Sequence, residues 1–274
     1  MNKPSRSLHS FLIGGVLFSV ATATSTLLIS TAQTNAVIDE KIQHALDTKL
    51  PGAIATATAN IEAEKTALIV QANLAGWDAA SPSTPDNRHI YGALNAEFSL
   101  VEYSDFECGY CRRFHDTPKG LVDQAGGRIN WEWQHFPLGF HNPVSSNASH
   151  ASMCVSELAG NRAFWAFTGA WFKASGMGGK GVEDITALAA SVGAPAKDFE
   201  ACMDSERYKQ AIEQQIEKGA AMGVTGTPGT FVVDNSTGNR VFVRGAQPAS
   251  SLIQAIKQLQ DMRQQPADTS ATEE

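Results

Sequence analysis

The first third of the chain is patterned for helices rather than strands. An uncharged, mostly apolar run extends from Phe11 to Ile29, preceded by Lys3 and Arg6 and followed by the small residues Ser30-Thr31-Ala32. This order of basic, apolar and small residues is typical of a secretory signal. The run is also long enough for a membrane span. We therefore expect residues 1–32 to be a cleaved signal peptide or a retained signal anchor.

Apolar positions at helical spacing continue beyond this segment. The stretch from Val37 to Leu50 predicts a helix, which Pro51-Gly52 should end. Ile54, Ile61 and Leu68 then recur every seven residues. The positions three residues further on are small or polar, so the pattern does not predict a full coiled-coil seam. We expect a helix that packs on its own domain, with an oligomerising arm as the alternative.

A turn-rich segment, Ser81 to Asn87, leads into a part of the chain where strands and helices alternate. The elements predicted from the hydrophobic pattern are a strand over 98–103, a helix over 108–123, a strand over 128–135, four or five helices over 145–223, strands over 230–234 and 240–244, and a helix over 248–262. This order predicts a strand–helix–strand unit, a helical block and a strand–strand–helix unit. The polar residues after Gln264 are expected to fray.

Composition narrows the class of protein. The chain has 274 residues, 43% of them hydrophobic, which is enough for a substantial core. Its 28 acidic residues exceed its 21 Lys and Arg residues, which gives a net charge of −7. A sequence-independent nucleic-acid binder needs a basic surface, so we expect no nucleic-acid partner. Four cysteines are too few for a small disulfide scaffold, but two of them define the candidate chemistry.

The motif Cys108-Gly109-Tyr110-Cys111 lies between a predicted strand and a predicted helix. In this context a C-x-x-C pair is typical of a redox-active dithiol. At the start of a helix, unpaired N–H groups stabilise the Cys108 thiolate, and the thiolate is the attacking species in disulfide exchange. Cys111 is one turn further on, where it can close a small disulfide and resolve a mixed disulfide.

Two other kinds of site also use a C-x-x-C pair. A zinc site would need a second pair of ligands, and Cys154, Cys202 and His150 lack that spacing. An inert structural disulfide is the other alternative, although such bridges seldom close so small a loop at a helix start. We expect no metal and no organic cofactor, because the dithiol itself is the redox group.

A second segment, Gly226-Thr227-Pro228-Gly229, directly precedes a predicted strand. Pro228 has no N–H to donate to a sheet. If the bond before it is cis, a tight turn forms and the backbone of Thr227 is free to pair with an extended substrate. An ordinary trans proline turn is the alternative.

Together, these two segments resemble the active-site segments of the DsbA-like thiol:disulfide oxidoreductases. The stretches His135–Leu138 and Ala163–Trp165 are similar as well, and the resemblance extends over roughly Leu94–Leu259. It implies an α/β, thioredoxin-like fold with an α-helical domain inserted between the second and third strands. It also implies that the Thr227-Pro228 bond is cis and faces Cys108.

The resemblance assigns the site residues. They are Cys108, Cys111 and Glu102 for catalysis, and Thr227, Pro228, Gly109 and Tyr110 for binding the substrate. Glu102 lies six residues before Cys108, where many members of the family keep a buried acid. A buried carboxyl group has a raised pKa and could relay the proton of Cys111. A partly exposed glutamate on the strand is the alternative.

The resemblance also implies a location and partners. We expect an enzyme in the periplasm or on the extracytoplasmic face of the membrane that forms or rearranges disulfide bonds in secreted proteins. Its partners would be unfolded, cysteine-containing exported proteins and a membrane redox partner that resets the dithiol. A homo-oligomer through residues 37–80 is a further option.

The direction of the exchange is open. The Gly-Tyr dipeptide and the threonine before the proline resemble the DsbC-type isomerases, whereas the long helical block resembles the oxidases. A disulfide isomerase, a dedicated reductase and a non-catalytic peptide-binding assembly module are therefore kept as alternatives.

The expected organisation has six parts. They are a signal peptide or anchor (1–32), a helical arm and linker (33–88), the first part of a thioredoxin domain (89–143), an inserted helical domain (144–223), the second part of the thioredoxin domain (224–264) and a flexible tail (265–274).

The helical block contains the other two cysteines. Cys154 and Cys202 are 48 residues apart, and export together with the even number of cysteines favours a structural disulfide between them. Two buried free cysteines are the alternative. The same block holds a Gly-rich loop, Gly176 to Gly181, which lacks the ending of a phosphate-binding loop.

Overall fold

The computed structural model describes residues 10–82 and 88–264. The chain divides into two units, Met1–Glu64 and Lys65–Glu274. Within the described residues, no helix is both long and apolar enough to cross a bilayer. Residues 1–9 of the expected signal segment, residues 83–87 of the expected linker and the expected flexible tail lie outside the described residues.

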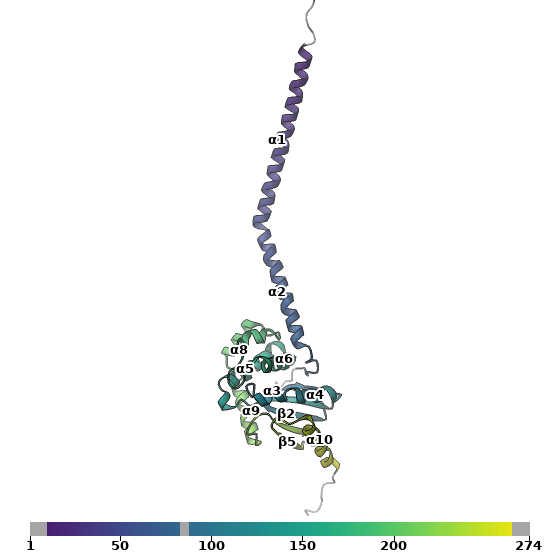
Figure 1. Cartoon of the computed structure of the whole chain (residues 1–274), viewed down its shortest axis with the longest axis vertical. Coiled ribbons are helices and arrows are strands. Elements are labelled where there is room, and N and C mark those ends of the chain that lie inside the picture. Colours follow the sequence, from purple (N-terminus) through teal and green to yellow (C-terminus); the bar gives the residue numbers. More distant parts are fainter. Residues whose placement is uncertain (1–9, 83–87, 265–274) are drawn as a thin grey trace, which may run out of the picture. The chain divides into compact units, whose positions relative to one another are not determined.

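Two long helices, α1 (Ser10–Thr48) and α2 (Leu50–Leu74), make up the N-terminal part of the chain (Figure 1). The helix predicted from Val37 onward is the second part of α1. The predicted helix ends at Thr48, just before Pro51-Gly52 as expected, but a second helix begins at once, and both residues lie in the first turn of α2. A proline is tolerated in a first turn, where its missing N–H would have no partner within the helix.

The apolar positions of α2 are not buried. Ile54, Ile61 and Leu68 are 56%, 63% and 60% exposed. Leu68 lies in the second unit, so the expectation that it packs on its own domain is wrong. Leu74, at the end of the helix, and Trp77, just after it, pack against the core of the second unit. The heptad spacing was therefore a correct indication of a helix but not of a buried face.

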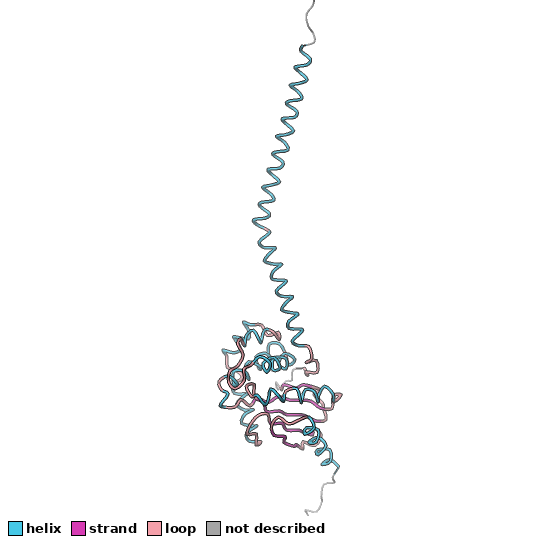
Figure 2. The backbone as a smooth tube through the Cα atoms, in the orientation of Figure 1, coloured by secondary structure: helices cyan, strands magenta, loops and turns pink. Residues whose placement is uncertain are grey.

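The second unit is built on a five-stranded mixed sheet with the order β1-β3-β2-β4-β5. Figure 2 shows the strands of this sheet in magenta. The strands are β1 (His89–Tyr91), β2 (Phe98–Ser104), β3 (Ile129–His135), β4 (Gly229–Asp234) and β5 (Arg240–Arg244). β2 and β3 run parallel, and the other neighbouring pairs are antiparallel. β2 to β5 match the predicted strands closely. β1 is only three residues long, too short to show an alternating pattern.

Two helices, α3 (Gly109–Phe114) and α4 (Asp116–Gln124), connect β2 to β3. The single helix predicted here is therefore wrong, since the chain breaks at His115. Pro118 explains the break: it has no N–H to donate to the carbonyl of Phe114, four residues earlier. The break leaves α3 as a short helix that carries the C-x-x-C motif.

The helical block lies between β3 and β4. Its elements are the 3-10 helix η1 (Gly139–His141) and the helices α5 (Val144–Ala159), α6 (Asn161–Ala174), α7 (Ile185–Ala190), α8 (Ala196–Asp204) and α9 (Lys209–Ala221). α10 (Ala249–Gln264) follows β5 and packs on β4 and β5. Since β3 and β4 are the second and third predicted strands, the predicted insertion is confirmed.

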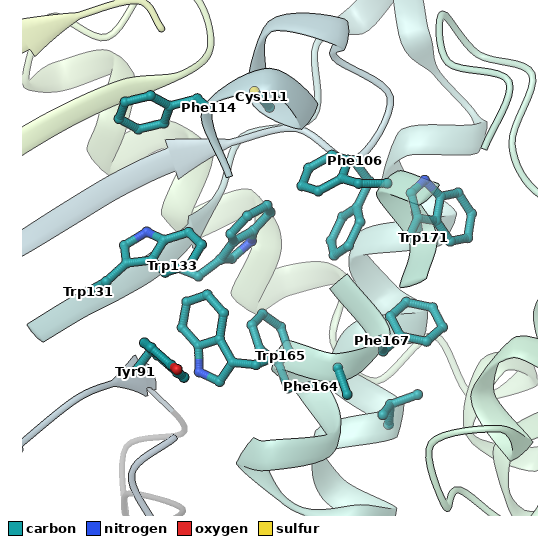
Figure 3. Packing of buried hydrophobic residues seen from close by; sticks show 14 of the residues in the cluster. Tyr91, Phe106, Cys111, Phe114, Trp131, Trp133, Phe164, Trp165, Phe167 and Trp171 are labelled. Atoms are coloured by element: carbon teal, nitrogen blue, oxygen red, sulfur yellow. The ribbon is translucent and has the colours of Figure 1, made fainter. Parts of the chain in front are cut away.

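Aromatic side chains join the helical block to the sheet. Figure 3 shows Trp131 and Trp133 from β3 beside Phe164 and Trp165 from α6. The ring centroids of Trp131 and Trp165 are 4.3 Å apart. All four of these side chains are fully or almost fully buried. Burying such large aromatic surfaces in one shared cluster makes the block part of the sheet's own core.

The predicted disulfide between Cys154 and Cys202 is confirmed. It joins α5 to α8, and both sulfurs are buried. Its two Cα atoms are 5.9 Å apart, a normal separation for a disulfide. The bridge therefore closes the helical block on itself, away from the C-x-x-C motif in sequence.

Candidate active site

The C-x-x-C motif lies at the junction between β2 and α3. The strand ends at Ser104, a short turn follows, and Cys108 is the N-cap residue of α3. The backbone N–H of Cys108 donates to the carbonyl of Asp105 (3.1 Å). Cys108 and Cys111 are both free thiols, and Cys111 is completely buried whereas Cys108 retains a small exposed surface. Cys108 is thus the sulfur that a substrate can reach.

The two thiols have opposite pKa shifts. The pKa of Cys108 is lowered to about 6. The main cause is a hydrogen bond from the Cys111 thiol, and the backbone amides of Cys111 and Tyr110 contribute in the same direction, against the effect of burial. Burial raises the pKa of Cys111 well above its ordinary value. Cys108 is therefore largely a thiolate at neutral pH while Cys111 remains protonated, which is the division of labour that disulfide exchange requires.

The proline segment lies directly opposite Cys108. The Thr227-Pro228 bond is cis, as the family resemblance implies. The Cys108 thiol donates to the carbonyl oxygen of Thr227 at 3.4 Å, across 119 residues of sequence. Pairing of β2 with β4, in which Tyr103 lies opposite Gly229, brings these two segments together at one end of the sheet.

Gly109 and Tyr110 form the exposed first turn of α3. Tyr110 is 61% exposed, and the guanidinium of Arg113 lies 4.4 Å from the centre of its ring. Such a cation–π contact fixes the orientation of the ring at the surface. The two residues are accessible beside Cys108, as a role in binding a substrate requires.

Glu102 is buried in the middle of the sheet, so the alternative of a partly exposed strand residue is wrong. The indole N–H of Trp131 donates to its Oε2 at 2.9 Å, and its Oε1 has no hydrogen-bond partner among the described residues. Burial is the main cause that raises the pKa of Glu102 to about 8, and the charge on Cys108 makes a smaller contribution in the same direction. Glu102 in turn raises the pKa of Cys111, so it lies within electrostatic reach of both cysteines.

Asp105 is a buried acid that sequence reasoning missed. Its carboxylate accepts from the backbone N–H of Glu107 (2.7 Å), from the N–H of Leu138 (2.9 Å), from the hydroxyl of Ser145 and from Nδ1 of His141 (2.7 Å). The active-site turn is thereby fastened to the segment that enters the helical block. The two acids that flank Phe106 in the sequence were the available signal.

Glu107 is the second of these acids. It is completely buried, and its carboxylate accepts four hydrogen bonds from α6 and the Gly-rich loop. Nothing in local spacing connects residue 107 to partners more than 60 residues away. Its role is developed further below.

A further group of residues with metal-binding atoms lies within the helical block. Ligand atoms of His150, Cys154 and Cys202 are all within 4.8 Å of one another. Both sulfurs are bonded to each other, and a disulfide offers no thiolate to a metal. This group therefore belongs to the structural disulfide.

Comparison with known families shows to which family the chain belongs. The family model described as thioredoxin matches residues 83–256. The chain belongs to the thioredoxin family. Within this family it is DsbA-like: the crystal structure of DsbA2 from Pseudomonas aeruginosa superposes with a TM-score of 0.57 at 28% identity, covering 63% of this chain and 94% of that one. Membership places the chain in the class of thiol-disulfide oxidoreductases.

A second solved structure supports the fold. The thiol-disulfide exchange protein alpha-DsbA2 from Wolbachia pipientis superposes with a TM-score of 0.54 over 63% of this chain and 87% of that one. Sequence identity is 21%, so this likeness concerns the thioredoxin-family fold alone.

The curated relatives are much longer proteins. The Na(+)/H(+) antiporter NhaA 1 of Mycolicibacterium gilvum is 30% identical over 178 residues, which are 64% of this chain and 27% of the antiporter. The antiporter NhaA of Herminiimonas arsenicoxydans is 29% identical over 151 residues, which are 55% of this chain and 23% of the antiporter. This thioredoxin-family chain thus spans about a quarter of the length of these relatives.

Proposed function

We propose that the chain is an extracytoplasmic enzyme that forms disulfide bonds in exported proteins. The observation that carries the proposal is the pair of opposite pKa shifts at Cys108 and Cys111, with Cys108 held against the carbonyl of Thr227. A thiolate stabilised in the reduced enzyme favours reduction of the enzyme and hence oxidation of the substrate. No metal or organic cofactor takes part, because the dithiol carries both electrons.

The exchange proceeds in two displacement steps. A substrate thiolate attacks Sγ of Cys108 in the oxidised enzyme, the Cys108–Cys111 bond breaks, and Cys111 leaves and takes up a proton. A second substrate thiolate then attacks the substrate sulfur of the mixed disulfide, and Cys108 leaves as a thiolate. The substrate loses two electrons and the enzyme gains them. In the reverse direction, Cys108 attacks a substrate disulfide and Cys111 resolves the intermediate.

Glu102 serves as the proton relay for Cys111. Its pKa of about 8 lets it exchange a proton near neutral pH, which is the property of an efficient general acid or base. Thr227 and Pro228 hold an extended substrate segment over Cys108, with Gly109 and Tyr110 beside it. These roles are supported by the burial of Glu102 and by the contact between Cys108 and Thr227.

The proposed location follows from the N-terminal segment. Its basic start and apolar run favour export, and disulfides persist only in an oxidising compartment. The partners would be unfolded, cysteine-containing exported proteins and a membrane redox partner that accepts the two electrons and resets the dithiol.

The decisive experiment compares two substrates. The oxidised chain lacking residues 1–32 should rapidly oxidise a reduced multi-cysteine protein, and Cys108→Ser should abolish this turnover. With a disulfide-containing protein as the second substrate, Cys111→Ala should accumulate mixed disulfides, because Cys108 attacks the substrate disulfide and no second thiol resolves the intermediate. Oxidation by Cys108→Ser at the wild-type rate would refute the mechanism. Inactivity of the wild type with every substrate would instead favour a non-catalytic peptide-binding module.

A disulfide isomerase is the second candidate, and the exposed apolar positions of the N-terminal helices favour it. Exposed Ile54, Ile61 and Leu68 could bring copies of the chain together through residues 37–80. An isomerase should refold a scrambled multi-disulfide protein in a glutathione buffer, and sedimentation should show an oligomer that Ile54→Glu/Ile61→Glu dissociates. If the chain is a monomer and does not refold the scrambled protein, the isomerase is excluded and the oxidase remains as the proposed function.

A further inference from the structure

The Gly-rich loop surrounds the carboxylate of Glu107. Oε1 accepts hydrogen bonds from the indole N–H of Trp171 (3.0 Å) and the hydroxyl of Ser175 (2.6 Å). Oε2 accepts from the backbone N–H groups of Gly179 (2.9 Å) and Gly181 (3.1 Å). Four donors for one completely buried side chain make this a built site rather than a chance contact.

The backbone of the loop is shaped for this carboxylate. Gly178, Gly179 and Gly181 have φ values of +67°, +84° and +70°, a region that glycine adopts without a steric cost. In this turn the N–H groups of Gly179 and Gly181 both point at Oε2 and form a concave anion site. The N–H of Gly178 also donates to the carbonyl of Glu107 (2.9 Å). The unusual glycine content of the loop is thus explained by residue 107.

The connection spans two parts of the fold. Glu107 precedes Cys108 in the turn after β2, whereas its partners lie at the end of α6 and in the loop that follows, more than 60 residues later. The carboxylate therefore ties the turn that carries the reactive sulfur to the inserted helical block.

We propose that Glu107 is a positioning residue for Cys108, which it holds in place by fastening the active-site turn to the Gly-rich loop of the helical block. The proposal rests on the proposed role of Cys108 as the reactive thiol. Cys108 is stabilised as a thiolate by the Cys111 thiol and by the amides of Tyr110 and Cys111. These donors act only over short distances, so a turn that shifts relative to α3 weakens them together.

Two substitutions separate position from charge. Glu107→Asp keeps the negative charge but shortens the side chain by one methylene, so it cannot reach both pairs of donors. Glu107→Gln keeps the length but replaces one oxygen, which accepts two hydrogen bonds, by an amide group that donates. If Glu107 acts by position, both variants disturb Cys108; if it acts by charge, only the Gln variant does.

The experiment measures Cys108 in the folded protein. The ultraviolet absorbance of the thiolate against pH gives the pKa of Cys108, and alkylation at pH 6 gives its reactivity. For Glu107→Asp we expect the pKa of Cys108 to rise by about one unit, which lowers the thiolate fraction at pH 6, and hence the alkylation rate, about fivefold. The reduction potential should become more negative in the same variant, because the reduced form loses stabilisation.

A matched control distinguishes this effect from general loss of stability. Asp234 is another buried carboxylate with several donors, at the opposite end of β4 from the proline segment. Asp234→Asn should lower the stability of the fold while the pKa of Cys108 stays within about 0.2 unit of the wild-type value.

A substitution at one of the hydrogen-bond donors to Glu107 tests the same connection if the Glu107 variants do not fold. Ser175→Ala removes one donor to Glu107 and an acceptor for the N–H of Met177. It should shift the pKa of Cys108 in the same direction by a smaller amount, and it should add little in the Glu107→Asp background because the two changes break one connection.

Three results would overturn the proposal. The first is a Cys108 pKa that is unchanged in both Glu107 variants. The second is a Cys108 pKa that is unchanged in Glu107→Asp but lowered in Glu107→Gln. The third is a shift of the Cys108 pKa in Asp234→Asn as large as that in Glu107→Asp. Cys108→Ser in the same exchange assay keeps the two claims apart. If that variant retains activity, the proposed function fails. If it is inactive while Glu107 variants behave as wild type, only the positioning role fails.

Discussion

Glu102 shows how a single residue can be useful for the site and costly for the fold. It is a carboxyl group enclosed by the sheet, with one oxygen bonded to the Trp131 indole and the other without a partner among the described residues. Burial raises its pKa to about 8 from an ordinary value of 4.5. The folded protein therefore holds a proton here that the unfolded chain has lost above pH 4.5, and stability falls as the pH rises toward 8.

Glu102→Gln should relieve this cost. The amide is close in shape to the protonated acid, and its oxygen can still accept from Trp131. We expect the free energy of unfolding at pH 8 to rise by an amount on the order of a few kcal/mol, with little change at pH 4, where the acid is protonated in both states. Urea unfolding of both proteins across this range is the measurement. An equal effect at both pH values would contradict the burial of a titrating acid.

The same variant should lose activity. Without a group that exchanges a proton near pH 8, release of the mixed disulfide should slow by a factor of about 10² or more. Single-turnover kinetics against pH should show that a transition near pH 8 disappears in Glu102→Gln. Retention of this transition would assign it to another group.

At the scale of elements, the helical block is closed by a covalent bond. The disulfide between α5 and α8 spans 48 residues. In the chain-entropy account, a bridge over a loop of this length restricts the unfolded chain and stabilises the folded state.

Cys154→Ala/Cys202→Ala should therefore lower the free energy of unfolding by about 3–4 kcal/mol. The C-x-x-C motif is untouched, so the pKa of Cys108 should remain as in the wild type. Unfolding by urea under oxidising conditions measures the loss, and adding a strong dithiol reductant should bring the wild type toward the variant. Equal stability of both proteins without reductant would show that the bond contributes nothing.

At the scale of the whole folded unit, buried histidines make stability sensitive to acid. Burial lowers the pKa of His89 to about 4 and that of His115 to about 3, it lowers the pKa of His135 well below 6.5, and it also lowers the pKa of His150. The unfolded chain takes up protons at these residues below pH 6.5 while the folded protein does not. Each of the three most deeply buried histidines, His89, His115 and His135, should therefore lower stability by about 1.4 kcal/mol per pH unit as the pH drops from 6.5 toward 4. Glu102 contributes one change of similar size and opposite sign between pH 8 and 4.5, so the histidines together outweigh it.

His115→Phe tests this expectation at one of the three. The imidazole lies among the rings of Trp77, Trp131 and Phe172, and neither ring nitrogen has a hydrogen-bond partner within the described residues. The variant should be at least as stable as wild type at pH 7, and the slope of its stability against pH below 6.5 should decrease by about 1.4 kcal/mol per pH unit. His44→Gln, on exposed α1, is the control. An unchanged slope in His115→Phe would contradict a buried neutral imidazole.

The sequence by itself determined the features that depend on neighbours along the chain. The strand before Cys108 and the strand after Pro228 follow from the apolar pattern and from the turn residues beside them. The C-x-x-C pair at a strand–helix junction identified the chemistry. Even the break at His115 was available in Pro118, although the prediction overlooked it. Family resemblance supplied the rest, including the meeting of Cys108 with Thr227.

Only the tertiary structure decided what surrounds these segments. No periodicity relates Glu107 to Gly179 and Gly181, or Asp105 to His141, because these hydrogen bonds join residues that become neighbours only when the helical block packs on the sheet. The heptad positions of α2 are the converse case, since regular spacing specified a helix but could not say whether its apolar face is buried. Local pattern encodes backbone conformation, whereas burial and hydrogen-bond partners depend on contacts between distant segments.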